Sequence, residues 1–300
     1  KWLHFLCSQG HAFLDINSGV RVFVNSANDG KENLDAPHFP KDALQTAHYF
    51  PMHTPDTLLA LSKLASSDKG RYAIHAMEFE HYERGLRVTA TDGRKLASVA
   101  FGEVSGKNTR SQAHAQLFRF LTETLDKLAG RPRSFDVASI PEHCVLRFTG
   151  TYKGWDSVVL FPERGHYPDW RAVMPRTKHV TVVPPGALGT IDQLQGCTAV
   201  ESQAIRMEIE AERWTLRAKA GHIASVAVLP LPAKVKQHKD HENTVIGISP
   251  VYVAEVADVL LTRGGDVDGL LFKYIDGGHG VLWESPAFPH DVYLNMPIDI

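Results

Sequence analysis

The stretch LRVTATDGRKLASV at residues 86–99 predicts the local fold of this chain. Hydrophobic and polar residues alternate on both sides of the Asp92-Gly93 pair, which is typical of two strands joined by a tight turn. Gly93 can adopt the positive φ angle that such a turn requires, because it has no Cβ atom. The stretch is therefore predicted to be a β-hairpin. By itself, its turn TDGRKL at 91–96 is also compatible with an ordinary turn that has no binding role.

Outside this hairpin, a helical pattern recurs four times at intervals of about 60–70 residues. In the first occurrence Thr54 occupies the N-cap position and Pro55 the first helical position. Each helical segment is followed by two or three runs with strand character. A helix followed by antiparallel strands, repeated in this way, predicts an α+β fold with two pseudo-symmetric domains. Two unrelated α+β domains with a coincidental helix spacing are the alternative. The helical segments are 54–67, 114–130, 184–196 and 249–264.

The composition is that of a folded, soluble protein. With 300 residues, 43% of them hydrophobic and 22% charged, the chain is long enough for about two domains. No apolar run approaches the roughly 20 residues of a membrane span. The net charge of −2 argues against tight binding to nucleic acid through phosphate contacts. Cys7, Cys144 and Cys197 are far apart and odd in number, which favours a reducing, cytoplasmic location over a disulfide framework. Because the chain begins on Lys1, we expect it to be part of a longer polypeptide.

Three stretches in this order resemble the bacterial DNA polymerase III β subunit, the replicative sliding clamp. They are residues 86–99, GHYPDWRAVMP at 165–175 and YLNMPIDI at 293–300. In addition, LDINSGVRVFV at 14–24 followed by HFP at 38–40 resembles the end of the first domain in that family. The resemblance implies the DNA-clamp (processivity) fold, an α+β fold of repeated helix and antiparallel-strand units, with helices inside a ring and sheets outside.

The resemblance also implies how the chain is divided. Residues 1–50 would be the C-terminal remnant of clamp domain 1, residues 51–175 clamp domain 2 and residues 176–300 clamp domain 3. Head-to-tail closure in the family joins domain 1 of one subunit to domain 3 of the next. We therefore expect a homo-oligomeric ring only if domain 1 is restored.

A sliding clamp has no catalytic centre and needs no cofactor or metal. The resemblance implies that the chain encircles double-stranded DNA independently of sequence, tethers DNA polymerase to its template and confers processivity in replication. Its partners would be DNA polymerase, the clamp loader and repair proteins, which bind through a short linear motif; no membrane is involved. The alternative is a clamp-fold adaptor that binds partner peptides without encircling DNA.

In this family a hydrophobic groove on the face of the ring receives the linear motif. Two positions depart from the family pattern, since Ala172 and Asp299 stand where a basic residue is usual. The chain ends at Ile300 directly after a strand-like run, so we expect this end to be docked. The residues that match groove positions are Ile74, Thr91, Gly93, Arg94, Leu96, Pro168, Val173, Ser249, Tyr252, Met296, Pro297 and Ile298.

The resemblance places DNA contacts on the helices. Each basic residue alone is typical of a solvated surface, but together they form a set around the first two helices. The third and fourth helices carry Asp192, Glu255 and Asp258, so the inner surface is predicted to be basic on one arc and neutral or acidic on another. The DNA-facing residues are predicted to be Lys63, Lys69, Arg71, Arg119, Lys127, Arg131 and Arg133.

An enzyme is the rival class. His238 and His241 lie three residues apart, a spacing that could bind Zn²⁺ on a helix. Their segment is polar and lies between two strand-like runs, so a solvated loop is the better interpretation. GGHG at 277–280 predicts a flexible turn with an exposed His279. No GxSxG, HExxH or P-loop pattern occurs. We therefore predict a non-catalytic protein.

Overall fold

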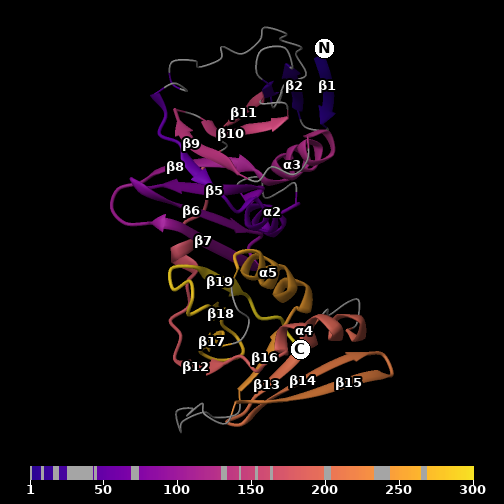
Figure 1. The fold of residues 1–300 in the computed structure, drawn as a ribbon. Helices are drawn as coiled ribbons and strands as arrows, with labels where there is room; N and C mark the ends of the chain where they lie inside the picture. The colour runs from indigo at the N-terminus through magenta and orange to yellow at the C-terminus, as the bar shows by residue number, and fades with distance from the viewer. Residues whose placement is uncertain are drawn as a thin grey trace. The chain divides into compact units, whose positions relative to one another are not determined.

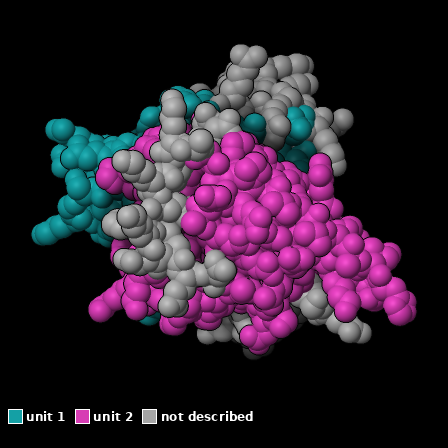
Figure 2. All heavy atoms as spheres, turned by 90° about the horizontal axis from the view of Figure 1, so that it is seen from below, with its two compact units in different colours: residues 1–62, 68–88, 100–167 teal, residues 63–67, 89–99, 168–300 magenta. Residues whose placement is uncertain are grey.

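The computed structural model places the chain in two compact units, which Figure 2 colours separately. Unit 1 comprises residues 1–62, 68–88 and 100–167, and unit 2 comprises residues 63–67, 89–99 and 168–300. No helix among the described residues is long and apolar enough to cross a membrane. The described residues are 2–7, 10–15, 20–25, 43, 46–68, 74–129, 134–141, 143–152, 155–162, 165–198, 204–232, 244–264 and 269–300.

Unit 1 contains a seven-stranded sheet with the order β1-β2-β3-β11-β10-β9-β4. Figure 1 labels β1, β2, β9, β10 and β11 of this sheet. Most of its strand pairs are antiparallel, as predicted, but β3 and β11 run parallel, with Val20 opposite Ser157. The repeated pattern of a helix and antiparallel strands did not predict this one parallel pair. A parallel pair needs a long connection, and the chain between these two strands contains many other elements. The strands are β1 (Trp2–Cys7), β2 (Gly10–Asp15), β3 (Val20–Asn25), β4 (Phe50–Met52), β9 (Phe135–Ile140), β10 (His143–Tyr152) and β11 (Trp155–Pro162).

Two helices match the first two predicted helical segments. They are α2 (Pro55–Leu64) and α3 (Ala115–Ala129). The whole of α3 and most of α2 belong to unit 1, whereas Lys63 and Leu64 at the end of α2 belong to unit 2. Pro55 begins α2 as predicted, but the capping role of Thr54 is wrong, because its buried hydroxyl has no hydrogen-bond partner among the described residues. The remaining strands of this unit are β5 (Ala76–His81) and β8 (Thr109–His114), which pair antiparallel. The hairpin strands β6 (Arg84–Thr91) and β7 (Lys95–Glu103) contribute residues to both units.

Unit 2 contains β19, which pairs with β7 of this hairpin, and the strands beside β19. Here β12, β17, β18, β19 and β7 lie side by side in this order, and a separate four-stranded sheet has the order β15-β14-β13-β16. The first set is β12 (His179–Val182), β17 (Leu271–Tyr274), β18 (Val281–Glu284) and β19 (Val292–Asn295). The second set is β13 (Ile205–Ile209), β14 (Arg213–Ala220), β15 (Ile223–Pro230) and β16 (Thr244–Ile248).

The last two predicted helical segments are also helical in unit 2. They form α4 (Ala187–Leu194), followed by the 3₁₀ turn η3 (Gln195–Cys197), and α5 (Pro250–Thr262), which packs against α4. The core between the two sheets is aromatic. The rings of Trp214 and Trp283 both meet Phe272 edge-on, with centroids 5.2 and 4.8 Å away, a favourable geometry for aromatic pairs. Helices and predominantly antiparallel sheets in both units confirm the predicted α+β class.

Candidate functional site

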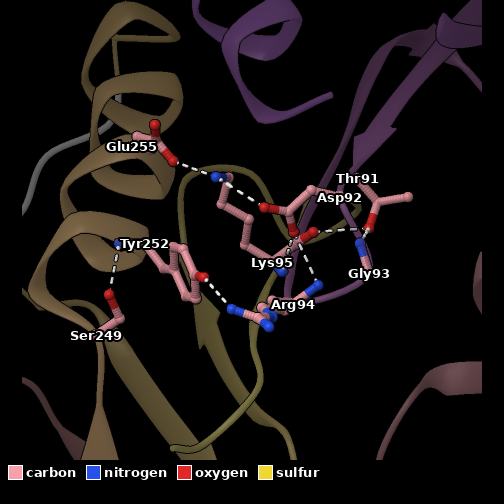
Figure 3. A network of polar contacts seen from close by, with 8 residues as sticks. All are labelled: Thr91, Asp92, Gly93, Arg94, Lys95, Ser249, Tyr252 and Glu255. Atoms are coloured by element: carbon pink, nitrogen blue, oxygen red, sulfur yellow. Dashed lines mark hydrogen bonds and ion pairs between the residues drawn. The ribbon is translucent and has the colours of Figure 1, made fainter. Parts of the chain in front are cut away.

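The turn between β6 and β7 is held by its own side chains (Figure 3). The Thr91 hydroxyl donates to the Lys95 carbonyl oxygen at 2.7 Å and accepts from the Gly93 amide at 3.0 Å. One carboxylate oxygen of Asp92 accepts from the amides of Arg94 and Lys95 at 2.8 and 3.0 Å. Gly93 has a φ of 90°, as the hairpin prediction required. Thr91 is thus buried within the turn, and Arg94 is its exposed charged side chain.

Lys95 connects this turn to α5. Its ammonium group lies 3.0 Å from the Asp92 carboxylate, forms an ion pair with Glu255 and lies 4.8 Å from the centre of the Tyr252 ring (Figure 3). The Lys95 side chain is only 8% exposed. Burial alone lowers the pKa of Lys95, but the hydrogen bond to Glu255 and the charge of Asp92 outweigh it, so the pKa is raised above its ordinary value. Lys95 therefore stays charged at neutral pH.

The start of α5 is positioned by a cap and by Arg94. The Ser249 hydroxyl accepts from the Tyr252 amide at 3.5 Å, and Pro250 occupies the first helical position. Ser249 is buried, so its observed role is that of a helix cap. The guanidinium group of Arg94 donates to the Tyr252 hydroxyl at 3.0 Å. The hairpin turn and the first turn of α5, distant in sequence, therefore form one polar network.

An apolar cluster lies beside this network. Leu96 of β7 is opposite Leu294 of β19, and both pack with Trp170. Leu96 is 2% exposed, so the structure places it in the buried cluster and not on an open rim as predicted. Trp170 belongs to the 3₁₀ helix η2 (Trp170–Val173), which begins with Asp169 accepting from the Arg171 amide at 3.2 Å.

Several apolar residues of the predicted groove are exposed or half-buried. Val173 is 58% exposed and Met296 is 36% exposed. Pro168 is also exposed, whereas Pro297 and Ile298 are half-buried. The Met296 amide donates to the Arg94 carbonyl oxygen at 2.7 Å, so the end of the chain lies beside the hairpin turn.

We call the combination of the 91–96 turn, η2, the first turn of α5 and residues 296–298 the turn–helix surface. All four parts belong to unit 2. Of the predicted groove residues, Ile74 is buried in unit 1, and its membership of the groove stays a prediction. Sequence reasoning missed Lys95. Lys95 lies three residues after Asp92, and a lysine at that distance can reach the Asp92 carboxylate; this spacing was the available signal.

The predicted DNA-facing residues are only partly described. Lys63 on α2 is exposed and forms an ion pair with Asp258 of α5 at 2.9 Å. Arg119 on α3 is half-buried. Because Glu255 also pairs with a lysine, both acidic residues of α5 are charge-compensated. The structure describes the backbone of Lys127 in α3 but not its side chain. Four of the predicted residues lie outside the described residues, namely Lys69, Arg71, Arg131 and Arg133.

The described residues contain no group of three or more His, Cys, Asp or Glu side chains that could hold a metal ion. His238 and His241 lie outside the described residues, as does the HFP segment at 38–40. His279 is exposed and contacts Asp276 at 2.7 Å. The chain forms a turn here as predicted, and a Cβ atom at Gly277 would lie 2.3 Å from the Val245 carbonyl oxygen, so this position has room only for glycine; the flexibility of the turn stays a prediction. Burial raises the pKa of the Cys144 thiol to about 12, which is unsuitable for a nucleophile.

The chain matches no family model and no curated protein by sequence. Its fold, in contrast, is found in bacterial sliding clamps. The DNA polymerase III β subunit of Thermotoga maritima matches with a TM-score of 0.65 and 16% identity, over 99% of this chain and 76% of that one. The C. crescentus β sliding clamp matches with a TM-score of 0.67 and 19% identity, over 100% and 76%. The Helicobacter pylori β clamp bound to a DNA ligase peptide matches with a TM-score of 0.65 and 11% identity, over 100% and 76%. These matches confirm the DNA-clamp fold.

Proposed function

We propose that this chain is a DNA sliding clamp subunit that tethers a DNA polymerase to its template and confers processivity. The observation that carries the proposal is the clamp fold, shared with bacterial DNA polymerase III β subunits over 99–100% of this chain. A closed ring stays on DNA because it cannot dissociate without opening. It therefore needs few phosphate contacts, which agrees with the net charge of −2. The role is non-catalytic, is carried out in the cytoplasm and requires no cofactor.

Within this proposal, residues 1–50 are the remnant of domain 1, residues 51–175 are domain 2 and residues 176–300 are domain 3. Unit 1 ends at Tyr167 and the last part of unit 2 begins at Pro168, which supports a boundary between domains 2 and 3 in that region. The residues of the 91–96 turn, although they belong to domain 2 in sequence, have most of their contacts with the later part of the chain. The helices of each domain would line the hole, and the sheets would form the outside.

The turn–helix surface is the proposed binding site for partner peptides. Val173 and Met296 offer apolar contacts, and Arg94 offers a charged hydrogen-bond donor at the same place. A mainly apolar site with a few polar groups suits a short segment with two or three hydrophobic anchors. The peptide-bound H. pylori clamp supports the assignment by analogy. The partners would be DNA polymerase, the clamp loader and repair proteins.

Ring closure is proposed to use β15. This strand is the first in its four-stranded sheet and exposes Ile223, Val226 and Val228. An edge strand with exposed apolar side chains is prone to pair with another chain. We propose that domain 1 of a neighbouring copy, once it is restored, covers this edge, which makes the ring a head-to-tail homo-oligomer.

The alternative function, an adaptor that binds peptides without encircling DNA, is favoured by the lack of basic residues on α4 and α5. These helices carry Asp192, Glu255 and Asp258 and no lysine or arginine. Primer extension with DNA polymerase III and a clamp loader distinguishes the two functions. A sliding clamp increases the length of product made in each binding event, and the increase disappears on short linear templates with free ends. An adaptor binds the partner peptide and leaves product length unchanged.

A further inference from the structure

The segment Met296–Ile300, which we call the terminal segment, lies against glycine residues. A Cβ atom at Gly247 of β16 would lie 2.0 Å from the Ile298 carbonyl oxygen and 2.6 Å from the Cγ2 atom of Ile300. A Cβ atom at Gly280 would lie 3.2 Å from the Met296 sulfur. The approach at Gly247 is too close for any other amino acid without movement of the backbone, whereas the flexible end of Met296 could move away from Gly280.

The backbone of Gly247 does not itself require glycine. Gly247 is not among the described glycines with a positive φ angle, and it lies inside a strand, where glycine packs poorly and weakens pairing. Its neighbours Ile246 and Ile248 are fully buried, and alternate residues of a strand point to opposite faces. The missing side chain of Gly247 is therefore on the face where the terminal segment lies.

The terminal segment is attached at two points. The Ile298 amide donates to the Gly247 carbonyl oxygen at 2.9 Å, and the Met296 amide donates to the Arg94 carbonyl oxygen at 2.7 Å. The first bond holds the segment to β16, and the second holds it to the hairpin turn. Displacement of Ile298 from β16 would therefore change where Pro297 and Ile298 lie relative to the rest of the turn–helix surface.

We propose that Gly247 is a positioning residue of the partner-peptide site. Its lack of a side chain allows the terminal segment to lie on β16, which places Met296, Pro297 and Ile298 at the turn–helix surface. This inference rests on the proposed peptide-binding function, and Gly247 acts only through the terminal segment. Gly247 itself does not contact the peptide.

The test uses the full 300-residue chain with Gly247→Ala. Gly189→Ala in α4 is the matched control, because a Cβ atom there meets nothing within 4 Å in the same unit. Hydrogen exchange at the Ile298 amide reports whether the segment is docked. Fluorescence polarisation with a labelled Gln-Leu-Ser-Leu-Phe peptide reports binding. We expect Gly247→Ala to increase the rate of hydrogen exchange at the Ile298 amide and to lower the affinity for the peptide about tenfold or more. The control variant should change neither quantity.

A chain that stops at Asn295 separates positioning from general stability. In that shortened chain, Gly247→Ala should cause no further loss of affinity, because the segment through which it acts is gone. Additive losses, or unchanged exchange and affinity in the 300-residue variant, would overturn the proposal.

If Gly247→Ala fails to fold, Ile298→Pro removes the hydrogen bond from the Ile298 amide to the Gly247 carbonyl oxygen without changing β16. Unaltered affinity in that variant would also overturn it. Failure of the unaltered chain to bind the peptide would refute the binding function itself, and the exchange at Ile298 would still show whether Gly247 holds the segment.

Discussion

The network around Lys95 predicts that one ion pair on α5 contributes to stability and another does not. Lys95 and Glu255 have side chains that are 8% and 32% exposed. Lys63 and Asp258 are 47% and 41% exposed. A hydrogen bond to a charged group contributes about 1.5–3 kcal/mol when it is shielded from water, and the partial exposure of Glu255 reduces this to about 1–2 kcal/mol. An exposed pair contributes about 0–0.5 kcal/mol.

Two double-mutant cycles measure these values, because each cycle removes the cost of leaving one partner unpaired. The first combines Lys95→Met with Glu255→Gln, and the second combines Lys63→Met with Asp258→Asn. Urea unfolding, monitored by circular dichroism, gives the free energy of unfolding for each variant. We expect a coupling of about 1–2 kcal/mol in the first cycle that persists in 1 M salt, and a negligible coupling in the second. Equal couplings in both cycles would refute the argument that burial makes the Lys95 pair the stronger one.

Three further predictions concern single residues. Leu96→Ala should lower the free energy of unfolding by about 2–5 kcal/mol, measured by urea unfolding, because the side chain is buried between Trp170 and Leu294; a stable variant that only loses peptide binding would contradict this. Arg94→Ala should leave the thermal midpoint nearly unchanged and weaken peptide binding several-fold in fluorescence polarisation, because the side chain is exposed at the turn–helix surface. His81 has its pKa lowered to about 4, first by burial and then by the charge of His48. Between pH 6.5 and 4, His81 is therefore protonated in the unfolded chain but neutral in the folded one. The free energy of unfolding has its full value above pH 6.5 and falls by up to about 3 kcal/mol towards pH 4. His81→Gln should remove that part of the pH dependence, and an unchanged profile would show that His81 is not its source.

Local patterns in the sequence were sufficient for most helices and for the hairpin. The apolar spacing at 114–130 predicts α3, and the Asp92-Gly93 pair predicts the turn, because both depend on residues a few positions apart. The strand β8 (TRSQAH) was not predicted, since it is polar and has no clear alternation. It is a strand because it pairs with β5, where Gln112 lies opposite Glu78. The run that forms β16 was recognised only as the strand-like run that follows the segment of His238 and His241, without bounds of its own, and Gly247 interrupts its short apolar stretch.

The sequence by itself determined the residue types of the candidate site, through the motif around residues 91–96 and the resemblance that it carries. Only the tertiary structure decided their roles. It buries Leu96, uses Ser249 as a helix cap and places Lys95 between two carboxylates. These roles depend on which distant segment covers each side chain: β19 covers Leu96, and α5 supplies the partner of Lys95. Turn and helix propensities act over a few residues, whereas burial and ion pairing depend on contacts made across the fold.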